Sequence, residues 1–122
     1  MRFIETKAHG MLDYLMGVLL IISPWLFDFD NGGAAQWIPM ILGFSTIFYS
    51  IITNYELGLL KIISMKTHLM IDLFSGILLA VSPWLFGFAE LVYLPHLILG
   101  LAEIAASLCT KKQPSYPQAT AG

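Results

Sequence analysis

Two short patterns in the sequence combine residue types that can carry proton or metal chemistry. His9 precedes Asp13 by four residues, and His68 precedes Asp72 by the same four. Residues four apart lie one above the other on a helix, so an imidazole and a carboxylate at this spacing can share a hydrogen bond. A third acidic residue, Glu103, also lies in an apolar stretch. These five residues are the candidates for chemistry, and what they can do depends on the elements that hold them.

The segments that carry these residues are apolar enough to cross a membrane. Hydrophobic residues make up 57% of the 122 residues and charged ones only 11%, against about 25% in a globular domain. The charge-free run 31–55 is longer than the about 20 helical residues that cross a bilayer core. Two further apolar runs reach that length only when Asp13 or Asp72 is included, and the last run contains Glu103. We therefore predict an all-α integral membrane protein with four transmembrane helices, at about 9–29, 36–54, 68–88 and 91–109.

The basic residues indicate which side of the membrane each end of the chain faces. All six lie before the first predicted span, between the second and third, or after the fourth: Arg2, Lys7, Lys61, Lys66, Lys111 and Lys112. The other two connections contain acidic residues and no basic ones. Because basic residues concentrate in cytoplasmic loops, we expect a multi-pass protein of the cell membrane (inner or plasma membrane) with both termini in the cytoplasm.

The chain is an internal duplication. A shift of 59 residues places His9 on His68 and Asp13 on Asp72, and it superimposes SPWLF at 23–27 on the same letters at 82–86. Beyond the first outer loop the shift becomes 57. Self-similarity at a fixed period is the signature of repeated structural units. Because each unit holds two spans, we predict two tandem helical hairpins related by a pseudo-twofold axis along the membrane normal.

The hairpins and their connections divide the chain into four parts. The first two-span repeat is 1–54 and the second is 67–110. Between them, 55–66 sets lysines among leucines and isoleucines, which predicts a cytoplasmic interfacial connector that forms a short helix on the membrane surface. The segment 111–122 has no hydrophobic periodicity, and we expect it to be a disordered cytoplasmic tail.

The doubled tripeptide Ser-Pro-Trp ends the first span of each repeat, as Ser23, Pro24 and Trp25 and again as Ser82, Pro83 and Trp84. A proline inside a helix removes one backbone donor, so the carbonyl four residues earlier loses its partner. The preceding serine, or a group on a neighbouring helix, can supply a hydrogen bond to that carbonyl, and tryptophan is typical of the membrane–water interface. We interpret the motif as a kink, a local repair and an interfacial anchor; a role in ligand gating or recognition is the alternative.

With this doubled motif and its two-span unit, the chain resembles the SPW-repeat family of small bacterial integral membrane proteins over about residues 4–110. The resemblance implies the membrane topology of two hairpin repeats. It implies no activity.

Small residues lie on one face of each predicted helix and suit close packing. The faces hold Gly17, Gly43, Gly76 and Gly100, one in each span, in line with polar or hydroxylated residues such as Thr53 on the second span and Thr110 on the fourth. Small residues let membrane helices approach closely. We predict that the four faces meet in the centre of the bundle.

The polar residues in the spans have three interpretations. The two His/Asp pairs are predicted to face each other near the cytoplasmic side, with Glu103 nearby and Thr46 in its place in the first repeat. In the first interpretation, the carboxylates and histidines neutralise each other and fix the helix register. In the second, they form a pocket for a proton, a cation or a small ligand. The third interpretation is metal or haem ligation by His9 and His68. Because a metal site needs three or four converging ligands and the spacing shows only pairs, the sequence predicts no metal and no cofactor.

For function, two classes of protein stay open. The favoured one is a non-enzymatic scaffold, accessory or interaction protein whose partners are the bilayer, a second copy or another membrane protein. The alternative is an oligomeric, transporter-like protein that handles a small ligand, a cation or a proton through its carboxylates Asp13, Asp72 and Glu103. The single cysteine, Cys109, excludes an internal disulfide and a Cys-x-x-Cys motif. Nothing in the sequence indicates nucleic-acid binding, and His96 is expected to be a capping or interfacial residue near the outer surface.

Overall fold

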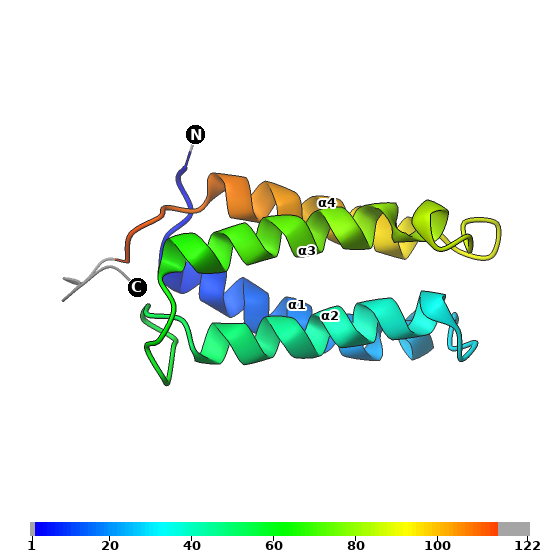
Figure 1. The fold of residues 1–122 in the computed structure, drawn as a ribbon, viewed down its shortest axis with the longest axis horizontal. Helices are drawn as coiled ribbons and strands as arrows, with labels where there is room; N and C mark the ends of the chain where they lie inside the picture. Colours follow the sequence, from blue (N-terminus) through cyan, green and yellow to red (C-terminus); the bar gives the residue numbers. More distant parts are fainter. Residues whose placement is uncertain (1, 115–122) are drawn as a thin grey trace.

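The computed structural model describes residues 2–114, and within them the chain forms four helices in two hairpins (Figure 1). They are α1 (Thr6–Leu26), α2 (Ala34–Ile51), α3 (Met65–Leu85) and α4 (Leu94–Cys109). Helix α1 packs on α2 and α3 packs on α4, and the hairpins meet mainly through α2 and α3. The connector between α2 and α3 lies at the same end of the bundle as both termini, and we call this the connector end. The opposite end, with loops 27–33 and 86–93, is the loop end.

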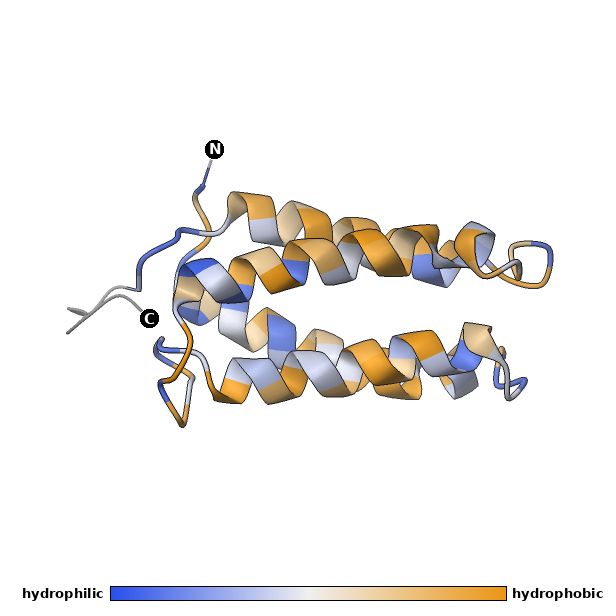
Figure 2. Cartoon of the chain, viewed as in Figure 1, coloured by the Kyte–Doolittle hydropathy of each residue, from blue (hydrophilic) through white to orange (hydrophobic). Residues whose placement is uncertain are grey.

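The predicted all-helical fold is confirmed, with one helix shorter than expected. Helices α1, α2 and α3 have 21, 18 and 21 residues and are long and apolar enough to cross a membrane. Helix α4 has 16 residues, about 24 Å at 1.5 Å per residue. Pro95 lies in its first turn, a position that proline favours because the missing N–H has no helical acceptor there. Figure 2 shows apolar residues along the helices and hydrophilic ones gathered toward the two ends.

The connector is not the interfacial helix that the sequence predicted. No helix forms between Ile51 and Met65; the backbone doubles back onto the end of α2. The last carbonyls of a helix have no partner within it, and here the connector supplies their donors. The N–H groups of residues 59 and 60 bond to the carbonyl of Ile51, and those of residues 62 and 63 bond to that of Ile52, at 2.8–2.9 Å. The connector therefore caps the end of α2 and does not form the predicted helix on the membrane surface.

The glycines join the two helices within each hairpin. A Cβ added at Gly17 would lie 3.0 Å from the carbonyl oxygen of Gly43, and one added at Gly76 would lie 3.0 Å from that of Gly100. One added at Gly100 would lie 2.5 Å from the backbone nitrogen of Ala80. The prediction that these faces meet at the bundle centre is therefore wrong for the glycines, which allow α1 to approach α2 and α3 to approach α4.

The serine of each Ser-Pro-Trp motif repairs the gap that its proline leaves. Ser23 Oγ donates to the carbonyl of Leu20 at 2.8 Å, and Ser82 Oγ donates to that of Leu79 at 2.7 Å. These carbonyls lie four residues before Pro24 and Pro83, where the missing N–H would have bonded. The predicted repair is therefore confirmed in both repeats.

The tryptophans of the two motifs face outward. Trp25 and Trp84 are each 55% exposed and lie near the loop end of α1 and α3. This placement suits the predicted contact with the membrane surface.

A third proline carbonyl is repaired from another helix. Pro39 lies inside α2, and the carbonyl four residues earlier belongs to Ala35. His96 Nε2 on α4 donates to this carbonyl at 2.8 Å. The ring lies between Phe29 and Phe88 and is 1% exposed. His96 is therefore a buried tie between the two hairpins, and the interfacial role expected for it is wrong.

The predicted tail, 111–122, lies outside the described residues from 115 onward. Its first residue is held at the connector end, because the N–H of Lys111 bonds to the carbonyl of Ile4 at 2.9 Å. The Lys111 ammonium also lies 2.7 Å from the Glu5 carboxylate.

Replacing Ser82 by Ala should destabilise the protein only while Pro83 is present. The single change leaves the carbonyl of Leu79 without a donor, which we expect to lower the free energy of unfolding by about 1 kcal/mol. In a Pro83→Ala background the backbone N–H restored at position 83 bonds to that carbonyl, so S82A should cost less than half as much. Equilibrium unfolding of the four variants in detergent measures the difference. Equal costs in both backgrounds would contradict the repair.

Candidate functional site

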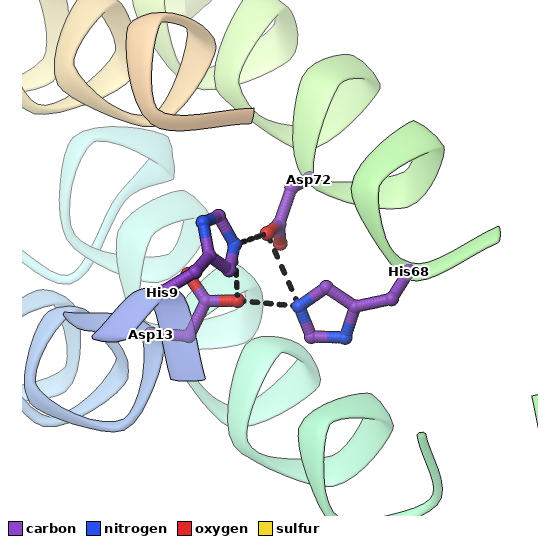
Figure 3. A group of neighbouring side chains, drawn as sticks. All are labelled: His9, Asp13, His68 and Asp72. Carbon is purple, nitrogen blue, oxygen red and sulfur yellow. Dashed lines mark hydrogen bonds and ion pairs between the residues drawn. The ribbon is translucent and has the colours of Figure 1, made fainter. Parts of the chain in front are cut away.

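Two histidines and two aspartates meet between the hairpins near the connector end (Figure 3). His9 and Asp13 come from α1, and His68 and Asp72 come from α3. We call these four residues the His/Asp cluster. Each is at most 5% exposed. The structure thus brings the two predicted pairs together.

Each histidine lies closer to the aspartate of the other hairpin than to the one on its own helix. The Nε2–Oδ2 distance is 2.6 Å from His9 to Asp72 and 2.5 Å from His68 to Asp13. Within one helix the corresponding distances are 3.1 and 3.2 Å. The contacts four residues apart that the spacing indicated are present, and the sequence did not show that the shorter contacts join the two hairpins. Because the short contacts cross from α1 to α3, the cluster links the two hairpins.

A threonine hydroxyl fixes the orientation of each ring. Thr110 Oγ1 donates to the carbonyl of Ala106 at 2.6 Å and lies 2.7 Å from His9 Nδ1. Thr53 Oγ1 donates to the carbonyl of Tyr49 at 2.5 Å and lies 2.8 Å from His68 Nδ1. A hydroxyl has one proton to donate, and each threonine donates it to the backbone carbonyl. The hydroxyl therefore presents only a lone pair to the histidine. Each Nδ1 must therefore carry a proton and donate to its threonine.

This assignment fixes the number of protons in the cluster. With Nδ1 protonated on both rings, each short Nε2–Oδ2 contact holds one further proton, because two lone pairs would otherwise face each other. The two carboxylate charges are thus balanced by two shared protons, and the cluster is neutral as a whole. Inserting an isolated charged residue at the centre of a membrane helix costs about 2.5–3.5 kcal/mol. Neutralisation across the hairpins is therefore what allows these residues inside the bundle.

The cluster also contains the groups that could hold a metal ion. One ring nitrogen from each histidine and one carboxylate oxygen from each aspartate all lie within 4.8 Å of one another. The sequence showed two separate pairs, whereas the structure places four possible ligands together.

Four further residues border the cluster although their spacing did not place them in the site: Tyr49, Thr53, Tyr55 and Thr110. The Tyr49 hydroxyl donates to Asp72 Oδ1, the oxygen that the histidines leave free. Tyr55 in the connector is fully buried, and its ring centre lies 5.6 Å from that of His68. Burial raises the pKa of the Tyr55 phenol above its usual value. The available signal for both threonines was the duplication, which places them at equivalent positions.

Glu103 lies close by without joining the cluster. Its side chain is buried, and neither carboxylate oxygen has a hydrogen-bond partner among the described residues. With Asp13 and Ala106 it lines a cavity of about 280 Å³ between α1 and α4. The duplication places Ala106 on Tyr49, so a tyrosine contacts the cluster on the α2 side while an alanine lines the hollow on the α4 side.

The first repeat has a different group in the place of Glu103. Thr46 Oγ1 donates to the carbonyl of Leu42 within its own helix at 2.8 Å. The asymmetry predicted from Thr46 and Glu103 is therefore present, and Tyr49 and Ala106 enlarge it. The pseudo-twofold axis itself stays a prediction.

Exchanging both aspartates for asparagine should preserve the link between the hairpins, whereas exchanging both for leucine should not. An asparagine N–H can donate to the Nε2 lone pair of a neutral histidine whose Nδ1 is protonated. We expect Asp13→Asn with Asp72→Asn to unfold within about 1 kcal/mol of the wild type. Asp13→Leu with Asp72→Leu leaves two buried nitrogens without partners and should cost at least about 2 kcal/mol. Unfolding in detergent measures both, and equal losses would contradict the assigned hydrogen bonds.

Comparison with known proteins identifies one family. The family model of the SPW repeat domain matches residues 7–110, which include all four helices from the second residue of α1 onward. The searches of curated proteins and of solved structures each found no match. The matched region contains both Ser-Pro-Trp motifs and the whole His/Asp cluster. The chain therefore belongs to the SPW repeat family.

Proposed function

We propose that this membrane protein is a non-enzymatic scaffold or accessory subunit. The observation that carries the proposal is that the polar groups best placed for chemistry bond to one another across the hairpins. Both histidines and both aspartates take part in these bonds, and the threonines and Tyr49 complete them. Such a cluster suits a structural role, because it fixes how the two hairpins sit together.

The surface available to partners is then the outer face of the helices. Large apolar side chains that are 60–65% exposed include Phe44 and Phe48 on α2 and Phe74 on α3. Such faces suit contact with lipid, with a second copy or with another membrane protein. A scaffold needs a rigid arrangement of faces of this kind.

We further propose that the connector end faces the cytoplasm and that the protein resides in the inner or plasma membrane. All six basic residues belong to the two terminal segments, to the connector or to the first turns of α1 and α3, which lie at that end. Basic residues concentrate on the cytoplasmic side of membrane proteins, which supports this orientation.

A second candidate function has its own observation in Glu103. A buried carboxyl without a partner, beside a cavity, is a group that a ligand could satisfy. The cavity of about 280 Å³ is near the lower limit for a small-molecule site. This favours a protein that handles a cation, a proton or a small polar ligand, in which Glu103 and Asp13 would meet it.

Native mass spectrometry of the protein gently extracted from its own membrane separates the two functions. The scaffold proposal expects a stoichiometric complex with a second copy or another membrane protein, present equally in wild type and in Glu103→Gln. A small-molecule adduct that is lost in E103Q would favour the second function. Glu90→Gln is the matched control, because Glu90 is exposed in the loop between α3 and α4. Protein that carries lipid alone would contradict the scaffold proposal.

A further inference from the structure

We propose that the His/Asp cluster is a binding site for one divalent transition-metal ion of the zinc class. The ligands are Nε2 of His9, Nε2 of His68 and one carboxylate oxygen each from Asp13 and Asp72. This inference goes beyond the proposed scaffold function and does not depend on it. It concerns which ion the His/Asp cluster can bind.

The donor set and its geometry fit such an ion. Two imidazole nitrogens and two carboxylate oxygens are common ligands of Zn²⁺, which prefers four-coordinate tetrahedral sites. At metal–ligand distances of about 2.0–2.1 Å, neighbouring ligand atoms in a tetrahedron lie about 3.3 Å apart. The contacts within α1 and within α3, at 3.1 and 3.2 Å, are already close to that value. The two contacts between the hairpins, at 2.6 and 2.5 Å, must widen by about 0.7 Å.

Charge balance also fits a divalent ion. In the metal-free cluster two shared protons balance the two carboxylates. One divalent cation carries the same charge, so it can replace both protons and leave the cluster neutral. A monovalent cation would replace only one of the two protons. Mg²⁺ and Ca²⁺ carry the right charge, but they prefer oxygen ligands to imidazole nitrogens. The divalent transition metals are therefore the class that satisfies both the charges and the nitrogens.

The surroundings of the histidines are those of metal ligands. A metal-bound histidine usually donates its other ring N–H to an oxygen, which fixes the tautomer and leaves the second nitrogen free for the metal. Thr53 and Thr110 accept these N–H groups, so both Nε2 atoms point into the cluster. Tyr49 donates its hydroxyl to the remaining oxygen of Asp72 and so fixes the orientation of that carboxylate.

On one side the cluster borders a cavity that an ion could use as a route. The cavity between α1 and α4 reaches Asp13, and the carboxylate of Glu103 lines the same cavity. The carboxyl oxygens of Glu103 and Asp13 are ligands that could hold a cation there as it moves toward the cluster.

Zinc binding by full-length protein, purified without a histidine tag, tests the proposal. We expect one Zn²⁺ per chain by metal analysis after dialysis, and a Co²⁺ form with the strong visible absorption of four-coordinate cobalt. Asp13→Asn with Asp72→Asn replaces both carboxylate ligands by neutral amides, which bind zinc poorly and cannot balance its charge, and should weaken zinc binding at least 100-fold. Thr53→Val with Thr110→Val should weaken it about 10–100-fold without removing a ligand.

The matched control is His96→Gln, which removes a buried histidine at the loop end and should leave zinc binding unchanged. Wild-type protein that retains no zinc, or zinc that persists in the double asparagine variant, would overturn the proposal. Unfolding curves show whether that variant is folded. If it is not, the threonine variant, which keeps all four ligands, decides the question by its affinity.

Discussion

A charged side chain inside a membrane span needs a partner that neutralises it, and in this protein the partner comes from the other hairpin. His9 contacts Asp72 and His68 contacts Asp13, each across the two hairpins. The closest histidine to each carboxylate therefore comes from the other hairpin. This exchange places α1 beside α3 at the connector end, where the two shared protons lie. Thr53 and Thr110, just beyond the ends of α2 and α4, then fix the rings. The neutral cluster from α1 and α3 is therefore held in place by residues that follow the other two helices.

Backbone carbonyls inside a membrane span also need partners, in their case hydrogen-bond donors. Three prolines lie inside helices, and each leaves a carbonyl that lipid cannot satisfy. Ser23 and Ser82 repair two of them within their own helices, whereas the third is repaired by His96 from the opposite hairpin. Polar links between the hairpins thus exist at both ends of the bundle. Between these ends, glycines hold each hairpin together by close contact of its two helices.

The sequence predicts the local and repeated features of the fold well. It predicts fewer of the contacts that form between the two hairpins. The four helices follow from apolar composition, the duplication follows from comparing the sequence with itself, and the serine repair involves residues within about one turn of each other. Spacing alone could not show that His9 prefers Asp72 to Asp13, since that depends on the distance between α1 and α3. His96 was misassigned for the same reason: its acceptor is the Ala35 carbonyl, freed by Pro39 in another helix. The cavity follows from Ala106 in place of Tyr49, a difference that is visible only when the repeats are superimposed.

The central claim is that the histidine–aspartate contacts cross between the hairpins, and solid-state NMR in lipid bilayers tests it most directly. In protein labelled with ¹⁵N histidine and ¹³C aspartate, dipolar recoupling measures the distance from each Nε2 to each carboxylate carbon. The account predicts that His9 couples more strongly to Asp72 than to Asp13, and that His68 couples more strongly to Asp13. Both Nδ1 atoms should carry protons. Stronger coupling within each helix than between the hairpins would contradict the account.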